Sequence, residues 1–289
     1  MARNFSSGSN VQISPQDAFK CKDGGATIAF WLRTTQSNSN TGIASNWNGS
    51  SRGGLGILLN NVAGQVAFVA NGGLSPGGNI STSGAAVNDG NWHHIAITFD
   101  RTGASNNCRL YKDGVFSNQG TLDANWVQGG QTMIIGAAAD GFWARYNGDL
   151  AEWGHWDGKL TDLQIAALAS GAPCGYVNPA KLELYLPFFE SILDFGRNRF
   201  SVSNSSSVST KAHPRVRNRL FSAMGASLTD AKPPLRELAG VKLSYRINGT
   251  KDGRRSHGKM NFGMFGSGRV TTSNYVYPSG FSPKVIVVM

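Results

Sequence analysis

The sequence predicts an all-β protein whose main part is an antiparallel sandwich. Side chains that suit a core recur at every second position in short runs, and turn residues separate these runs. The 289-residue chain contains 37 glycines, and only 15% of its residues are charged, against about a quarter in an average soluble protein. This composition suits short strands and many turns.

The runs follow one another through the first 215 residues. Core-forming side chains alternate in residues 28–32, in residues 66–70 after a turn at Gly64, and in residues 93–99. The next run ends in Asp113-Gly114, a dipeptide typical of a tight hairpin because both central residues need positive φ. Each run therefore predicts a strand.

One helix is predicted among the strands, at residues 162–170. Thr161 suits the N-cap, and Gln164 completes a capping box with it. Leu160 and Ile165 have the spacing of a hydrophobic staple, and Gly171 with the proline at 173 ends the run. We expect this helix to close one end of the sandwich.

Three ordered segments resemble the laminin G-like (concanavalin A-like) jelly-roll domain. They are residues 90–100 (GNWHHIAITFD), residues 110–114 (LYKDG) and residues 148–156 (GDLAEWGHW), the last running into the helix. The resemblance covers residues 3–215. It is closest to versions found in tailed-phage and prophage virion structural proteins, which also begin near the initiator Met and carry a segment like Tyr185–Phe188 (YLPF).

Charge divides the chain. Residues 216–289 contain twelve Lys and Arg but only three Asp and Glu, which gives them +9 of the total net charge of +10. We therefore predict two parts, a jelly-roll domain at 1–215 and a basic C-terminal extension at 216–289. Clustered cations favour acidic protein surfaces, nucleic acid or anionic lipid, although a solvated basic face is the alternative.

The extension has strand character of its own. Alternation from 241 to 247 predicts a strand that ends at Asn248-Gly249, and residues 269–277 and 284–289 are further strand-like runs. The terminal run has no later partner, so we expect it either to join the sheet edge of another protein or to return to the edge of the jelly roll. The candidate partner-binding residues are Arg217, Arg219, Lys251, Arg254, Arg255, Lys259, Val285, Ile286, Val287 and Val288.

The resemblance also directs attention to catalysis. Related jelly-roll glycoside hydrolases use a Glu-x-Asp-x-x-Glu strand, and the comparable residues are Asn147, Asp149 and Glu152. Glycoside hydrolysis needs two carboxyl groups, and the amide of Asn147 cannot replace one of them. We therefore predict that the protein is not an enzyme and that this acidic pair is structural.

Metal ligation is not indicated by spacing. His93 and His94 are adjacent in a strand, so their rings point to opposite faces and cannot share an ion. Calcium, which some laminin G-like domains hold at the sandwich rim, could be held by Asp100, Asp140 and Asn147 only if the fold brings them together. No cofactor is predicted.

Aromatic residues supply the candidate glycan contacts. Trp47, Trp126 and Trp143 lie in loops rich in Gly and Asn, where a lectin would stack a sugar, although Trp also fills sandwich cores. Trp47 and Trp143 are the two candidate glycan-contact residues. Core or rim packing is the favoured alternative.

Two functions follow as hypotheses. The first is a non-catalytic structural protein of a phage virion, a jelly roll that the basic extension fastens to an acidic shell or tail protein in an oligomeric assembly. The second is a lectin-like carbohydrate-binding module for a cell-surface glycan.

The first 20 residues lack a secretion signal and no run could span a membrane, so we expect folding in the host cytoplasm, a virion location and no membrane partner. Cys21, Cys108 and Cys174 lack metal or disulfide spacing.

Overall fold

The computed structural model divides into two compact units, residues 1–224 (unit 1) and 225–289 (unit 2), and each is described by itself. The predicted division after residue 215 stays a prediction. The structure describes residues 2–6, 9–14, 25–46, 54–60, 62–70, 74–75, 78–100, 102, 104–124, 126, 132–138, 143–189, 192–204, 207–208, 212–214, 244–251, 254–261 and 284–286. No helix among them is long and apolar enough to cross a membrane.

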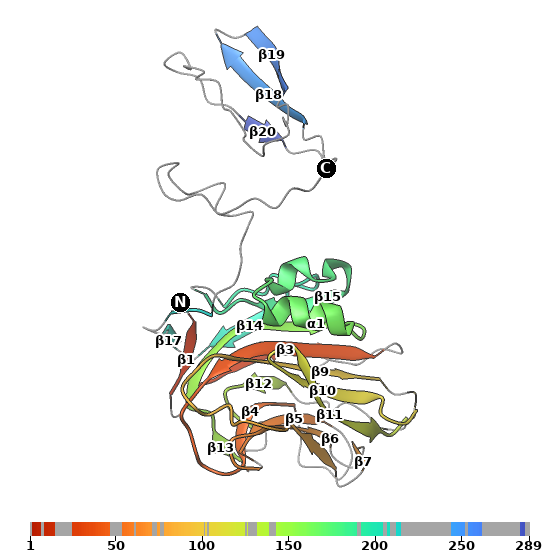
Figure 1. Cartoon of the computed structure of the whole chain (residues 1–289). Helices are drawn as coiled ribbons and strands as arrows, with labels where there is room; N and C mark the ends of the chain where they lie inside the picture. Colours follow the sequence, from red (N-terminus) through yellow and green to blue (C-terminus); the bar gives the residue numbers. More distant parts are fainter. Residues whose placement is uncertain are drawn as a thin grey trace. The chain divides into compact units, whose positions relative to one another are not determined.

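Unit 1 is a sandwich of two sheets with a helical layer on one side (Figure 1). The larger sheet has nine described strands in the order β17-β1-β14-β3-β9-β10-β11-β7, and β15 also pairs with β14. Their bounds are β1 Arg3–Phe5, β3 Ala26–Arg33, β7 Leu74–Ser75, β9 His93–Phe99, β10 Cys108–Lys112, β11 Val115–Leu122, β14 Gly148–Trp156, β15 Leu182–Leu186 and β17 Ser207–Val208.

The smaller sheet has eight described strands in the order β16-β2-β12-β4-β5-β6-β8, with β13 beside β4. Their bounds are β2 Val11–Ser14, β4 Thr41–Ser45, β5 Leu55–Leu59, β6 Val66–Ala70, β8 Asn79–Ser81, β12 Met133–Ile135, β13 Ala144–Arg145 and β16 Ser201–Asn204. Only the pairing of β13 with β4 is parallel among the described pairs of this sheet. The predicted antiparallel jelly-roll sandwich is confirmed.

The core lies between the two sheets, and the predicted alternation forms it. Phe30 is fully buried and stacks on Trp153, with ring centroids 4.7 Å apart. Phe68 of the smaller sheet stacks on Phe99 of the larger one at 5.3 Å, which ties the sheets together. The intervening residues of β3, including Trp31, lie on the opposite face of the sheet.

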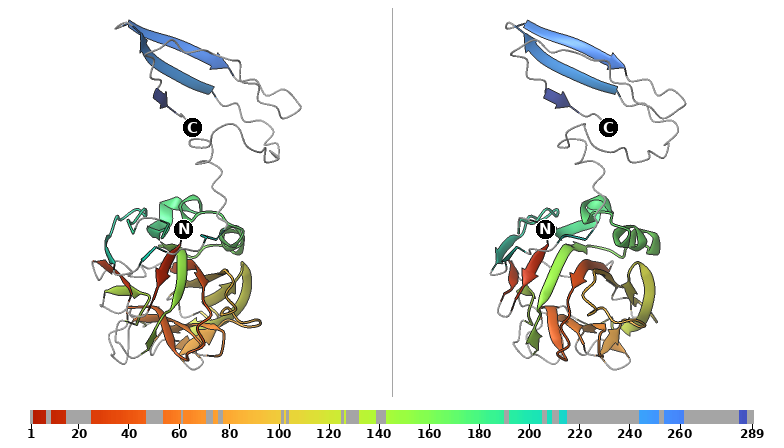
Figure 2. Two further views of the ribbon diagram at one scale, coloured as in Figure 1. Left: turned by 90° about the vertical axis from the view of Figure 1, so that its left-hand side faces the viewer. Right: turned by 60° about the vertical axis from the view of Figure 1, so that its left-hand side comes forward.

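The helical layer covers that outer face over part of its area (Figure 1). It contains α1 (Asp162–Ala169) and the short 3-10 helices η2 (Cys174–Tyr176) and η3 (Pro179–Lys181). Thr161 and Gln164 form both hydrogen bonds of the predicted capping box, and Leu160 and Ile165 are buried together. The bounds of the predicted helix are confirmed to within a residue. Its expected place at one end of the sandwich is wrong, because Ile165 packs with Ala29 and Ala96 on the outer face of the larger sheet. Figure 2 shows the green ribbon of the helix on one side of the sandwich in both views.

The predicted hairpin also forms. Lys112 of β10 lies opposite Val115 of β11, and the two residues between them both have positive φ, 52° at Asp113 and 82° at Gly114. The hairpin tip packs on α1, because a Cβ at Gly114 would lie 2.8 Å from Ala169. Glycine is thus needed there for conformation and for space.

Unit 2 is a three-stranded antiparallel sheet in the order β19-β18-β20 (Figure 1). The strands are β18 (Ser244–Lys251), β19 (Arg254–Asn261) and β20 (Lys284–Ile286). Asn248-Gly249 does not end the first strand, because β18 continues through it to Lys251, which lies opposite Arg254 of β19. Asn248 and Gly249 themselves pair with His257 and Ser256.

The terminal run finds a partner in its own unit. Val285 lies opposite Ile247 of β18. This corrects the expectation that the run has no main-chain partner nearby in its own chain, because β18 pairs with residues 284–286. Its contact with another protein stays a prediction. The expected strand at 269–277 lies outside the described residues.

Candidate functional site

The acidic residues of β14 are held in structural contacts. Asp149 accepts hydrogen bonds from Arg33, 2.5 Å from Nη2 and 3.1 Å from Nε, and from the amide of Asn4 at 3.0 Å. Glu152 lies at a bulge with φ of 51° and accepts a hydrogen bond from the Tyr185 hydroxyl at 2.8 Å. Burial raises the pKa of the Glu152 carboxyl to about 7. These contacts fit the structural role predicted for the pair.

A row of polar and aromatic side chains crosses the outer face of the larger sheet. Asn4, Asp149 and Arg33 are cross-strand neighbours on β1, β14 and β3. The guanidinium of Arg33 then lies over the ring of Trp92, 4.9 Å from its centroid. Beside this row, Trp31 contacts the ring of His94 edge-on at 5.3 Å. We call Trp31, Arg33, Trp92 and His94 the aromatic row.

The aromatic row contains the part-exposed tryptophans among the residues that the structure describes. Trp31 and Trp92 are of intermediate exposure. The other described tryptophans, which are Trp126, Trp143, Trp153 and Trp156, are all buried. Neither Trp31 nor Trp92 was among the predicted glycan contacts. Trp31 could have been identified from the alternation of β3, which places its large apolar ring on the face opposite Phe30.

The two adjacent histidines face different surroundings, as predicted. His94 is buried, and desolvation lowers the pKa of its imidazole to about 4, which keeps the ring neutral. His93 lies 2.8 Å from Asp113 and 3.2 Å from Asp89, and the hydrogen bond to Asp113 is the main cause of its raised pKa. The described part of the chain has no group of three His, Cys, Asp or Glu that could hold a metal ion.

A short segment at residues 212–214 contacts the same outer face, and we call it the strap. The carbonyl oxygen of Ala212 accepts a hydrogen bond from Trp92 Nε1 at 3.1 Å. Nε2 of His213 lies 3.2 Å from the oxygen of Pro187 and 3.6 Å from Glu152 Oε1. Burial lowers the pKa of His213. The strap therefore joins the aromatic row to the buried Glu152.

The loop tryptophans lie elsewhere. Trp143 is only 8% exposed and packs with Leu58 and Ala67 on the outer side of β5 and β6. A Cβ at Gly56 would lie 2.8 Å from its ring. Trp126 is buried in the main core, and Trp47 lies outside the described residues. The structure favours packing for Trp143, because stacking a sugar requires an open ring face.

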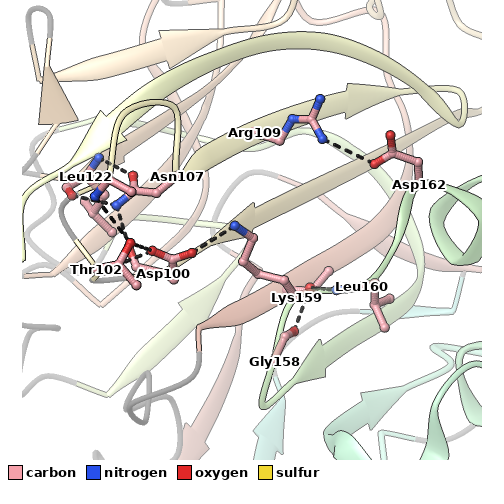
Figure 3. Close-up of polar contacts among 11 residues, drawn as sticks. Asp100, Thr102, Asn107, Arg109, Leu122, Gly158, Lys159, Leu160 and Asp162 are labelled. Atoms are coloured by element: carbon pink, nitrogen blue, oxygen red, sulfur yellow. Dashed lines mark hydrogen bonds and ion pairs between the residues drawn. The ribbon is translucent and has the colours of Figure 1, made fainter.

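The suggested calcium ligands do not converge. Asp100 accepts hydrogen bonds from Thr102 and from Lys159 Nζ at 2.8 Å, so an ammonium group already neutralises it (Figure 3). Asp100 follows the end of β9 that pairs with Ala26, whereas Asn147 precedes the end of β14 that pairs with Arg33. These ends lie about 20 Å apart along β3. Asp100 and Asn147 therefore cannot share an ion, and Asp140 lies outside the described residues.

The candidate partner-binding residues fall mainly in unit 2. Lys251 ends β18 opposite Arg254 of β19, and the remaining placed candidates, Arg255, Lys259, Val285 and Ile286, lie on β19 and β20. Arg217, Arg219, Val287 and Val288 lie outside the described residues. Their role in partner binding stays a prediction.

Comparison with known proteins agrees with the sandwich. Residues 5–166 match the family model of the concanavalin A-like lectin/glucanases superfamily. One relative is the rat (Rattus norvegicus) sushi, von Willebrand factor type A, EGF and pentraxin domain-containing protein 1. The chain is 31% identical to it over 156 residues, and the match covers 51% of this chain but only 4% of the rat protein. The rat neuronal pentraxin receptor is 24% identical over 50% of this chain and 29% of its own length.

A solved structure has a similar fold. It is that of a protein from Bacteroides ovatus assigned to carbohydrate binding, with a TM-score of 0.55 and 18% identity, and the match covers 75% of this chain and 61% of that one. The family model covers more than half of the chain, and the sandwich has the strand arrangement expected of it. The chain belongs to the concanavalin A-like lectin/glucanases superfamily.

Proposed function

We propose that the protein is a non-catalytic carbohydrate-binding module of the lectin type. The superfamily contains lectins and glucanases. The observation that carries the proposal is the state of the acidic residues at the start of β14. Asn147, just before the strand, stands in place of a carboxylate, and Arg33 neutralises Asp149. A glucanase needs two carboxyl groups free to act on either side of the glycosidic bond. This strand favours the lectin side of the superfamily.

The aromatic row is the proposed glycan contact. Sugar rings stack on tryptophan faces, and hydroxyl groups are held by charged and amide side chains. Trp31 and Trp92 offer part-exposed indoles, with Asn4, Arg33 and Asp149 beside them. Matches to proteins described by pentraxin domains and by carbohydrate binding support a carbohydrate-binding role for the chain.

A glycan array followed by titration of the best ligand tests the proposal. We expect Trp31→Ala and Trp92→Ala each to weaken binding about tenfold or more, because each removes a stacking surface, and Trp92→Phe to restore part of the affinity. Phe116→Ala is the matched control, since Phe116 is an exposed aromatic ring outside the aromatic row. No binding on the array, or equal losses for Phe116→Ala, would count against the site.

Catalysis is tested separately. We expect no release of reducing sugar from β-glucans or galactans, since a second free carboxyl group is missing. Glu152→Gln distinguishes an unexpected activity from contamination, because it removes the acid and keeps an acceptor for the Tyr185 hydroxyl. Activity that this substitution abolishes would overturn the non-catalytic assignment.

The second candidate function is a structural role in a phage virion, and the +9 charge of residues 216–289 is the observation that favours it. Cations clustered in one segment steer association with an acidic surface and make it sensitive to salt. Co-sedimentation of the full chain with assembled virion shells tests this role. The two functions are compatible if a jelly roll on the particle binds a cell-surface glycan.

A further inference from the structure

Four large apolar side chains protrude from unit 1 near the end of β15. Their exposed fractions are 46% for Tyr176, 50% for Phe189, 65% for Leu193 and 47% for Phe195. We call them the apolar patch. Folding leaves single apolar residues exposed on most proteins, but a cluster of large ones marks an interaction surface.

Two members of the apolar patch, Phe195 and Tyr176, lie beside Tyr185 of β15. Phe195 donates its backbone N–H to the oxygen of Tyr185 at 2.8 Å, and the two rings lie 6.4 Å apart. The neighbour of Tyr176 in η2, Gly175, also approaches Tyr185, whose ring lies 3.6 Å from a Cβ built at that glycine. On the side of the strap, the ring of Phe189 lies 5.9 Å from that of His213.

Cations flank the apolar patch. Arg199 lies over the ring of Phe195 at 5.9 Å, and Arg197 donates to the oxygen of Ala180, the residue before the exposed Lys181. Two described acids lie nearby. Asp194 accepts three backbone N–H groups, and Glu183 pairs with Arg197 at 3.2 Å. This ion pair neutralises Arg197 and leaves Lys181 and Arg199 as the cations for a partner. Glu190 lies outside the described residues.

Size and charge restrict what can cover the apolar patch. Four large side chains that are half exposed offer about 400 Å² of apolar surface. A stable protein interface buries about 800 Å² of accessible surface on each partner. In a two-fold dimer both copies would also bring Lys181 and Arg199 to the same interface, which would concentrate positive charge there. Self-association is therefore disfavoured on both counts.

We propose that the apolar patch binds the surface of an anionic lipid bilayer. Phe189 and Leu193 enter the boundary between headgroups and acyl chains, and Lys181 and Arg199 contact the lipid phosphates and carboxylates. The sequence predicts no membrane partner because no segment could span a bilayer, but peripheral binding needs only exposed apolar side chains and nearby cations. This contact is independent of the aromatic row.

Sedimentation of the full chain with large unilamellar vesicles tests the proposal. The vesicles are phosphatidylcholine alone or with about 30% phosphatidylserine, at low and physiological salt. The basic residues 216–289 can themselves attract anionic lipid, so the variants of the apolar patch decide the outcome. We expect Phe189→Ser and Leu193→Ser each to weaken partitioning about tenfold, because each removes buried apolar surface.

The matched control is Leu163→Ser, because Leu163 of α1 is 83% exposed and lies outside the apolar patch. All three variants should have the melting temperature of the wild type, since the altered side chains are exposed. Partitioning that is unchanged by both patch substitutions, or that falls equally with Leu163→Ser, overturns the proposal. A concentration-dependent dimer that Leu193→Ser dissociates would assign the patch to a second copy instead.

Discussion

At the residue scale, Glu152 shows what burial does to an acid. Its carboxyl has an ordinary pKa of 4.5 when unfolded and about 7 in the fold, because burial disfavours the charged form. Between these values the unfolded chain has lost the proton while the folded chain keeps it. Stability from this group is therefore fully present below pH 4.5 and is lost as the pH rises to about 7.

We expect Glu152→Gln to become increasingly more stable than the wild type as the pH rises from 4.5 to 7, by on the order of 3 kcal/mol at the upper end. Urea unfolding of both proteins across this range measures the difference. The comparison is repeated in a His213→Ala background, because His213 lies 3.6 Å from Glu152 and has a lowered pKa of its own. A difference that does not change with pH would show that Glu152 is not protonated in the fold.

Trp143 gives a second prediction at this scale. Its ring lies against Gly56 and is almost fully covered, so we expect Trp143→Ala to destabilise the fold by about 3 kcal/mol through the lost packing. Thermal unfolding and glycan binding are measured together. If the variant instead remains stable and loses glycan binding, Trp143 is a sugar platform, as its loop position suggests.

At the element scale, one side chain adds to the backbone pairing between β9 and the hairpin of β10 and β11. Asp113 accepts hydrogen bonds from the ring of His93 at 2.8 Å and from the backbone N–H of His94 at 2.9 Å. We expect Asp113→Asn to keep the turn, since Asn accepts positive φ, and to lower the pKa of His93 because the carboxylate is gone.

Nuclear magnetic resonance titration of the His93 ring measures this effect. Asp89→Asn is the control and should lower the pKa of His93 less, because the hydrogen bond to Asp113 is the larger cause of the shift. The raised pKa means that His93 stabilises the fold below pH 6.5 and that this stability is lost as the pH rises through the folded pKa. Equal shifts in the two variants would contradict the assignment.

Local chemistry explains which elements could be predicted from the sequence. The capping box at Thr161 and the turn at Asp113-Gly114 depend on residues a few positions apart, and both form as predicted. The strand of unit 2 was predicted to end at Asn248-Gly249, a dipeptide that is typical of turns, but β18 continues through it to Lys251. The pairing of β18 with β19, which the local sequence does not state, decides where the strand ends.

The candidate site depended on contacts that sequence spacing does not contain. Trp92 meets Arg33 only because β3 and β9 pair in one register, and His213 reaches Glu152 only because the chain returns over the sheet. Asp100 and Asn147 cannot share a calcium ion for the same reason, since the fold places them at opposite ends of β3. Residue type predicted what these side chains can do, and topology determined which of them meet.

At the scale of the whole molecule, unit 1 contains its own core. Its described core residues run from Phe5 to Phe188, and the strap at 212–214 adds contacts to Trp92 and Pro187. Unit 2 is a small sheet of three described strands. Three strands with little apolar surface are marginal alone, so the two units should differ greatly in stability.

Two truncations test this division together. We expect residues 1–224 to unfold at the melting temperature of the full chain, because every described core contact of unit 1 is kept. Ending the chain at residue 206 should cost about 2 kcal/mol, since it removes the strap's hydrogen bonds and the pairing of β17 with β1. Limited proteolysis should cut between 215 and 236 and leave the N-terminal fragment. A chain of residues 1–224 that melts several degrees below the full protein would show that unit 2 stabilises the jelly roll, and the basic extension would then be part of its fold.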